Sequence, residues 1–311
     1  MKNYKQIFDE LQKETGKVIV GQESIIEQIL VAILCDSNAL LEGYPGLAKT
    51  LTVRTLAQLM DLKFSRIQNT PDLMPSDITG TYIIEEASGK RQFKFQPGPI
   101  FANVVLADEI NRATPKTQSA LLEAMQEKQV TSGTNTFKLD MPFFVLATQN
   151  PIEQEGTYPL PEAQADRFLL KISVSYPTYE QEMEIVERYT AEARDNKLKV
   201  MLNKNHLLTL QGLTRQVPIA NDIKQRAVKI ILATRANKEI IQYGASPRAS
   251  IGLILAAKAR ALIQGRNHVS SEDLNLLAYP VLRHRIVLNF EAERKGMSKD
   301  DAIKGILDKA K

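Results

Sequence analysis

The sequence predicts an α/β protein in which a parallel sheet is followed by a helical region. Several short apolar runs each end in polar residues, a pattern typical of buried parallel strands with a ligand site at their carboxyl ends. A loop rich in Gly and Pro joins the first run to a helix. After Tyr176-Pro177 the pattern changes to helix signals without a convincing strand. We therefore expect an αβ core over residues 1–175 and a small all-α domain over residues 176–311.

The composition is that of an ordinary globular protein. The chain has 311 residues, of which 43% are hydrophobic and 24% charged. No apolar run approaches the ~20 residues of a membrane span, and no secretory signal peptide is expected. The single Cys35 cannot form an internal disulfide, and the three histidines show no metal-ligand spacing. These features favour a cytoplasmic protein without a zinc site.

The net charge of +4 is too weak to indicate a nucleic-acid partner, but it is unevenly spread. Residues 1–175 hold 17 basic and 21 acidic side chains, a net charge of −4. Residues 176–311 hold 23 basic and 15 acidic side chains, a net charge of +8. An acidic half followed by a basic half indicates two modules with different surfaces.

The loop after the first apolar run has the features of a phosphate-binding P-loop. Its glycines let backbone N–H groups face phosphate oxygens, and the following helix adds its positive dipole end. Lys49 would reach the β- and γ-phosphates, and Thr50 would offer its hydroxyl to Mg²⁺. Ala48 stands where the usual pattern has its last Gly, which weakens the match without removing it. The predicted nucleotide-binding residues here are Gly43, Tyr44, Pro45, Gly46, Leu47, Ala48, Lys49, Thr50 and Leu51.

The remaining elements can be predicted in chain order from periodicity and turn signals. In the first half we expect helices at 4–15, 25–33, 51–60 and from Thr114, strands at 39–41, 63–68, 101–109, 143–148 and 169–174, and hairpins at 79–95 and 129–141. The hairpins are insertions, and long insertions usually have a function. In the second half we expect helices at 178–193, 206–216, 219–237, 246–264, 271–283 and from Ser298.

Four features in this order converge on one site. They are the P-loop, a strand ending in Asp108-Glu109, a strand followed by Asn150, and Arg167 before the last strand. Each is weak alone, because a strand often ends in an acid and Asn before Pro is usually a turn. Arg167 could also simply pair with Asp166 or Glu162. Together the four features favour phosphoryl transfer, which needs charge stabilisation and a placed water.

Over nearly its whole length the chain resembles the MoxR family of AAA+ ATPases. The resembling stretches are residues 20–23, 43–50, 106–113, 147–151, 160–164, 166–168, 244–248 and 281–285. The family also carries Ala at the position of Ala48. The resemblance implies an AAA+ P-loop core with two inserted hairpins, a helical lid, and hydrolysis of ATP with Mg²⁺.

The resemblance also implies roles for individual residues. Asp108 and Thr50 would hold Mg²⁺, Glu109 would polarise the attacking water, and Asn150 would help to position it. Gly21 and Gln22 would lie beside the adenine. Arg167 resembles an arginine finger that acts on the neighbouring subunit's nucleotide, and Arg248 resembles a lid arginine that contacts phosphate. An extra helix, at 206–216, shifts the lid in this clade, so the sequence leaves open whether Arg248 acts in its own subunit or across the interface. Without that context, Arg248 could be a surface charge at a helix start.

The resemblance implies a homo-oligomeric ring, usually a hexamer, that acts as a chaperone-like remodeller of proteins with von Willebrand factor A domains. Alternatives remain. A DNA translocase of the same clade is less favoured, because the tip at 132–135 is uncharged and Glu85 and Glu86 offset Lys90 and Arg91 in the other hairpin. A metal-chelatase motor subunit stays open. A nucleotide-binding scaffold without hydrolysis has no need of Glu109.

Overall fold

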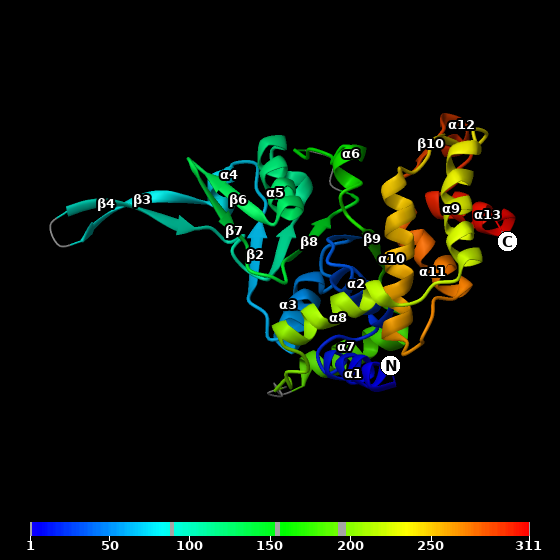
Figure 1. Cartoon of the computed structure of the whole chain (residues 1–311), viewed down its shortest axis with the longest axis horizontal. Coiled ribbons are helices and arrows are strands. Elements are labelled where there is room, and N and C mark those ends of the chain that lie inside the picture. The colour runs from blue at the N-terminus through cyan, green and yellow to red at the C-terminus, as the bar shows by residue number, and fades with distance from the viewer. Residues whose placement is uncertain (1, 88–89, 153–155, 192–196, 311) are drawn as a thin grey trace.

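A five-stranded parallel sheet forms the centre of the first half of the molecule (Figure 1). The structure is a computed structural model that describes residues 2–87, 90–152, 156–191 and 197–310. The strand order is β2-β5-β8-β1-β9. Their bounds are β1 Ala39–Gly43, β2 Phe64–Gln68, β5 Val104–Asp108, β8 Phe144–Gln149 and β9 Leu170–Val174. All five predicted strands are present, and the parallel α/β class is confirmed.

Helices cover both faces of this sheet. The longer ones are α1 Lys2–Thr15, α2 Glu23–Leu34, α3 Lys49–Leu59 and α5 Pro115–Glu127. Thr114 is the N-cap of α5, and its hydroxyl accepts a hydrogen bond from the Thr117 N–H, as its position before Pro predicts. Three short helices were not predicted, because they are too short to show a helical period: α4 Pro75–Thr79, η1 Ile110–Arg112 and α6 Glu162–Ala165.

Both predicted hairpins are present and share one aromatic cluster. They consist of β3 Gly80–Ala87 with β4 Lys90–Pro97, and of β6 Gln129–Ser132 with β7 Asn135–Lys138. The rings of Phe95 and Phe137 stack with centroids 4.0 Å apart, and Tyr82 and Phe101 pack edge-on against Phe95. Beyond this cluster, β3 and β4 extend away from the body as an arm (Figure 1).

The second half is helical, as predicted, but it also contains a short antiparallel strand pair. Its helices are α7 Tyr179–Thr190, α8 Lys204–Gln216, α9 Asn221–Ala236, α10 Pro247–Ile263, α11 Ser271–Leu282, α12 Phe290–Arg294 and α13 Lys299–Lys309. The pair joins β10 Ile241–Tyr243 to β11 Val287–Leu288. We expected no strand here; segments of three and two residues are too short to show alternation.

The buried core is continuous between the two halves. Side chains of α2 and α10 belong to one apolar cluster. The predicted extra helix, α8, packs against both α2 and α10, and the Gln211 side chain donates to the Ile33 carbonyl over 2.8 Å. The Tyr189 hydroxyl on α7 donates to Val18 O over 2.8 Å. The boundary at residue 176 therefore stays a prediction, because helices on its far side pack on the core.

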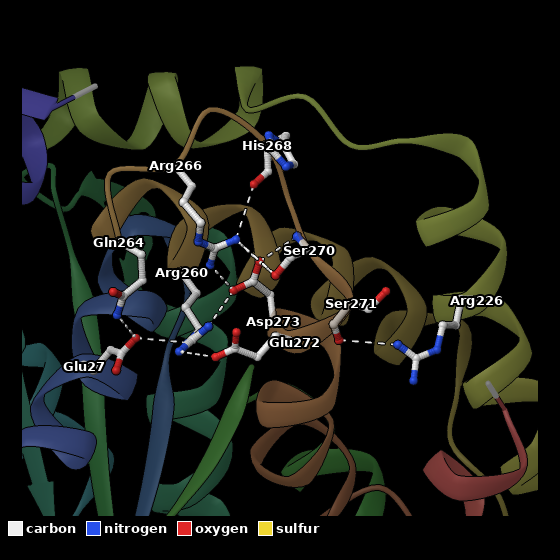
Figure 2. Close-up of polar contacts among 10 residues, drawn as sticks. All are labelled: Glu27, Arg226, Arg260, Gln264, Arg266, His268, Ser270, Ser271, Glu272 and Asp273. Carbon is white, nitrogen blue, oxygen red and sulfur yellow. Dashed lines mark hydrogen bonds and ion pairs between the residues drawn. The ribbon is translucent and has the colours of Figure 1, made fainter.

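A buried ion cluster joins the lid helices to each other and to α2 (Figure 2). Asp273 is fully buried and accepts hydrogen bonds from Arg260 over 2.7 Å and from Arg266 over 2.8 Å. Burial raises the pKa of the Asp273 carboxyl, but the bonds from Arg266, Ser270 and Arg260 outweigh that effect and hold the pKa below its usual value. Arg260 also pairs with Glu27 over 3.1 Å.

Replacing Asp273 by asparagine is expected to lower the free energy of unfolding by about 3 kcal/mol, because two arginines would lose their buried partner. Urea unfolding measures this change, with Asp308→Asn on exposed α13 surface as the control. Because the folded-state pKa of Asp273 is lowered, the wild-type advantage should be present at neutral pH and be lost as the pH falls through that pKa. A change below about 1 kcal/mol would show that this cluster adds little, as exposed ion pairs do.

Candidate functional site

The P-loop connects β1 to α3 and needs two left-handed backbone positions. Gly46 has φ 83° and Ala48 has φ 52°. Gly adopts such angles freely, whereas a non-Gly residue there costs on the order of 1 kcal/mol. A Cβ atom on Gly43 would lie 2.7 Å from the carbonyl oxygen of Val174, so close passage of β9 requires Gly at that position. Ala48 therefore keeps the loop geometry that a Gly would give, at a modest strain.

Lys49 folds back inside this loop. Its Nζ atom donates to the carbonyl oxygens of Gly43 and Tyr44, each over 2.7 Å. Burial lowers the pKa of the Lys49 ammonium, while Asp108 and Glu109 act in the opposite direction. The ammonium is thus held within the electrostatic reach of both carboxylates.

The P-loop forms one wall of a cavity of about 420 Å³. Arg66 on β2 and the carboxyl ends of β5 and β8 supply the other wall, because parallel strands present those ends on the same side of the sheet. The lining residues are Pro45, Gly46, Leu47, Ala48, Lys49, Thr50, Leu51, Arg66, Asp108, Glu109, Thr148, Gln149 and Asn150. The structure thus brings residues 45–51 of the predicted loop together with both acids and Asn150, whereas Gly43 and Tyr44 do not line this cavity.

Two side chains that sequence analysis missed contact Asp108. The Thr148 hydroxyl donates to Oδ1 over 2.6 Å, and Arg66 donates to Oδ2 through Nε over 3.0 Å and through its terminal nitrogen over 2.6 Å. Arg66 lies in the middle of β2 and Thr148 lies near the end of β8. Both strands pair with β5, so the sheet order identifies these residues although their local sequence does not. The Thr50 hydroxyl and the Asp108 carboxylate are hard oxygen donors of the kind that suits Mg²⁺.

Glu109 leaves the strand, contrary to the expected extent of residues 101–109. It has φ 54°, and its N–H donates to the Thr148 hydroxyl over 2.8 Å. Successive side chains of an extended strand point to opposite faces, so a straight strand would separate the two acids. The left-handed turn instead lets Asp108 and Glu109 line one cavity. Arg112 pairs with the Glu109 carboxylate over 3.2 Å.

Asn150 is largely buried directly after β8, where it lines the same cavity. Its Oδ1 atom accepts a hydrogen bond from the Ile152 N–H over 3.2 Å. The turn expected of Asn before Pro is therefore present, and the side-chain amide nitrogen, which has no partner among the described residues, is a donor for a ligand.

Gly21 and Gln22 border a second cavity, of about 140 Å³, on the other side of the P-loop. Its lining is mostly apolar, and includes Val18, Leu51 and Pro177, which suits a flat aromatic base. Gln22 donates to Leu47 O over 3.0 Å and accepts from the Thr52 hydroxyl over 2.9 Å. Gln22 therefore ties the start of α2 to the P-loop.

Arg167 and Arg248 do not line either of these cavities. They share a third cavity, of about 260 Å³, between α5 and α10. Arg167 is exposed and pairs with neither Asp166 nor Glu162 among the described residues. Asp166 instead accepts from Arg285 over 2.7 Å and lies 3.7 Å from Arg248.

Arg167 lies away from its own P-loop although its strand borders the strand that leads into that loop. β9 pairs directly with β1, with Gly43 opposite Val174. Arg167 precedes the amino end of β9, whereas the P-loop follows the carboxyl end of β1. The five residues of β9 span roughly 15 Å, so Arg167 lies near the amino ends of the strands, whereas its own P-loop lies at their carboxyl ends.

A five-stranded parallel sheet with this loop, these acids and a helical lid defines a P-loop protein of the AAA class. Comparison with known proteins agrees. Residues 38–170 match the ATPase family associated with various cellular activities (AAA), and residues 232–306 match the AAA lid domain.

Relatives that match over most of this chain identify the family within the AAA class. The chain is 45% identical to Chaperone MoxR1 of Mycobacterium tuberculosis, across 94% of this chain and 79% of that protein. It is 43% identical to the uncharacterized protein YeaC of Bacillus subtilis, across 95% of this chain and 92% of that one. The solved structure of a candidate ATPase from Cytophaga hutchinsonii superposes with a TM-score of 0.91 at 47% identity, covering 98% of this chain and 94% of that one. The chain belongs to the MoxR family of AAA ATPases.

None of the described helices is long and apolar enough to cross a membrane. Within the same residues, no group of three or more His, Cys, Asp or Glu side chains could hold a metal ion. The hydroxyl of Thr50 and the carboxylate of Asp108 are oxygen donors that would fit a cation with further ligands from phosphate, as Mg²⁺ has in nucleotide sites.

Proposed function

We propose that this protein hydrolyses ATP with Mg²⁺ in the cavity between the P-loop and the strand ends. One observation supports this most directly: Lys49, Asp108, Glu109 and Asn150 line the same 420 Å³ cavity. Lys49 would bind the β- and γ-phosphates, and Thr50 and Asp108 would hold Mg²⁺, which neutralises phosphate charge. Glu109 would accept a proton from the attacking water, and Asn150 would orient that water. The adenine would occupy the apolar cavity beside Gly21 and Gln22.

Replacing Lys49 by alanine is expected to abolish measurable ATP binding, because the ammonium inside the loop supplies its main positive charge. Isothermal titration with ATP and Mg²⁺ measures the affinity, and the exposed Lys116→Ala on α5 is the control. Unchanged affinity in a folded Lys49→Ala protein would mean that the nucleotide binds elsewhere.

We also propose a ring, with six subunits by family resemblance, in which Arg167 and Arg248 contact the neighbouring subunit's nucleotide. Their shared cavity lies near the amino ends of the strands, whereas their own P-loop lies at the carboxyl ends. This separation supports action in trans for both arginines. A planar guanidinium keeps its charge and offers several donors to phosphate oxygens. A contact between unlike surfaces of identical subunits closes into a ring when it repeats.

The proposed activity serves to remodel or activate a protein partner in the cytoplasm, with a von Willebrand factor A domain protein as the first candidate. The hairpin arm supports a protein partner over DNA. Ile84 and Phe93 lie opposite each other on one face of β3 and β4, and they are 62% and 77% exposed. Glu85 pairs with Lys94 over 3.0 Å on the other face, which leaves little free positive charge for a phosphate backbone. A chelatase motor subunit remains the alternative, because it would use the same core.

Changing Ile84 and Phe93 together to serine is expected to weaken partner binding by about 2 kcal/mol or more, as loss of an exposed apolar anchor does. ATP binding should not change, because the arm lies away from the nucleotide cavity. Capture of partner proteins by an ATP-bound, hydrolysis-deficient form measures the effect, with Gln92→Ser on the opposite face as control. Lost ATP binding in a folded variant would contradict a partner-facing role for the arm. Shortening the 129–141 hairpin tests whether that second hairpin also faces the partner: ATP binding should persist and partner remodelling should weaken.

A further inference from the structure

The segment from Arg283 to Arg285, which follows lid helix α11, holds the backbone on both sides of Arg167. Arg285 has a side chain only 3% exposed. It donates to Asp166 Oδ1 over 2.7 Å and to Leu169 O over 2.9 Å, and also to the carbonyls of Asp166 and Phe168. One guanidinium therefore holds the peptide group immediately before Arg167 and the carbonyls of the two residues that follow it.

The side chains of His284 and Arg283 make further hydrogen bonds to the same segment. His284 is buried, and its Nε2 lies 2.9 Å from Phe168 O, so it acts as the donor. Arg283 donates to Lys171 O over 3.1 Å and to the Ser173 hydroxyl over 2.8 Å. Three consecutive lid residues thus bind the segment that contains Arg167 and begins β9.

The Asp166 carboxylate connects these contacts to Arg248. Besides Arg285, its carboxylate accepts from the Ser246 hydroxyl over 2.9 Å and lies 3.7 Å from the Arg248 guanidinium. Ser246 is the N-cap of α10, and Arg248 is in its first turn. The backbone of Arg167 and the first turn of α10 are therefore positioned from the same carboxylate.

We propose that Arg285, assisted by His284, is a positioning residue for Arg167, so that the lid of one subunit sets the geometry of the finger that serves the next subunit's ATP. This rests on the proposed action of Arg167 in trans. Arg167 itself has no side-chain partner among the described residues, so its direction depends on the backbone that Arg285 and His284 hold. Residues 281–285 do not line the nucleotide cavity, and this proposal gives them the role of positioning Arg167.

Burial lowers the pKa of the Arg285 guanidinium, and the ion pair with Asp166 opposes that shift and stabilises the buried charge. Such a group could also serve only to attach the lid. The two roles predict different behaviour in mixed rings, because a finger defect affects only the interface that the finger enters.

The principal variant is Arg285→Lys, whose single nitrogen cannot replace a fork of donors. Turnover should fall about 10²-fold, the effect of a misplacement near 1 Å, while ATP affinity is unchanged. Mixed with Lys49→Ala subunits, which keep a good finger, the variant should regain activity. Mixed with Arg167→Ala subunits it should not, because neither partner then supplies a working finger.

Arg266→Lys is the matched control. It also removes donors to a buried carboxylate of the lid, Asp273 (Figure 2). Among the described residues, the Arg266 side chain donates to His268, Ser270 and Asp273 and not to residues 166–169. It should lower thermal stability and leave turnover near wild type at temperatures where it is folded. If Arg285→Lys behaves like this control, or regains activity equally with both partners, the positioning role is wrong.

A substitute variant and a reference mixture complete the experiment. If Arg285→Lys does not fold, His284→Leu takes its place, because the His284 Nδ1 atom has no hydrogen-bond partner among the described residues and only the bond to Phe168 is lost. It should show the same mixing pattern with a smaller loss. A mixture of Lys49→Ala with Arg167→Ala is the reference: no recovery there refutes action in trans, whereas recovery there without the Arg285 or His284 pattern refutes only this inference.

Discussion

Replacing Arg167 by alanine is expected to slow ATP hydrolysis by about 10³- to 10⁵-fold, the range for arginine fingers in phosphoryl transfer. The residue lies beyond the amino end of β9 and does not line its own nucleotide cavity, so ATP affinity should stay at the wild-type value. Steady-state phosphate release and ATP titration measure the two quantities. Arg294→Ala, on the exposed side of α12, controls for loss of a surface arginine.

Subunit mixing tests whether this effect crosses an interface. Lys49→Ala lacks a nucleotide site and keeps its finger, whereas Arg167→Ala keeps the site and lacks the finger. Each ring alone should be nearly inactive, and a mixture should recover part of the activity where a good site meets a good finger. Rings shown to be mixed by mass spectrometry, yet still inactive, would place the role of Arg167 within its own subunit.

Replacing Glu109 by glutamine is expected to lower turnover by about 10²- to 10⁴-fold, the usual contribution of a general base. The amide has the shape of the carboxylate but cannot accept the proton of the attacking water. Lys49, Thr50 and Asp108 are untouched, so ATP binding should persist and the variant should accumulate in the ATP-bound state. Single-turnover hydrolysis separates this chemical defect from slow product release.

Glu123→Gln, exposed on α5, is the matched control and should hydrolyse ATP like the wild type. Turnover in Glu109→Gln equal to that of this control would assign the base role to another group. The ATP-bound Glu109→Gln ring is also the reagent for identifying the protein partner, because it should hold a partner that the wild type releases.

Local sequence was sufficient for most of the fold. The three inner strands, β1, β5 and β8, begin as continuous apolar runs, and burial on both faces requires that pattern, whereas the edge strands β2 and β9 also carry polar residues. Thr114-Pro115 marked the start of α5 because cap chemistry is local. The strand pair of β10 and β11 was missed because it is formed by residues about 45 positions apart that have too few neighbours to show a period.

The site was predictable in part for the same reason. The Gly/Pro loop, Lys49-Thr50 and an acidic strand end can each be recognised within a few residues. Arg66 could not, because nothing near it in sequence indicates that β2 lies beside β5. The strand interpretation of Glu109 was also wrong, since only its left-handed backbone shows that both acids can line one cavity.

The sequence by itself thus determined the parallel α/β class, the phosphate-binding loop and the identities of the acids, because these depend on periodicity and short-range steric rules. The tertiary structure alone decided which side chains meet: Arg66 and Thr148 at Asp108, and Arg285, Ser246 and Arg248 at Asp166. Those meetings depend on strand order and on how the lid packs against the sheet. Both arise from burying apolar surface between segments far apart in the chain, which no local pattern records.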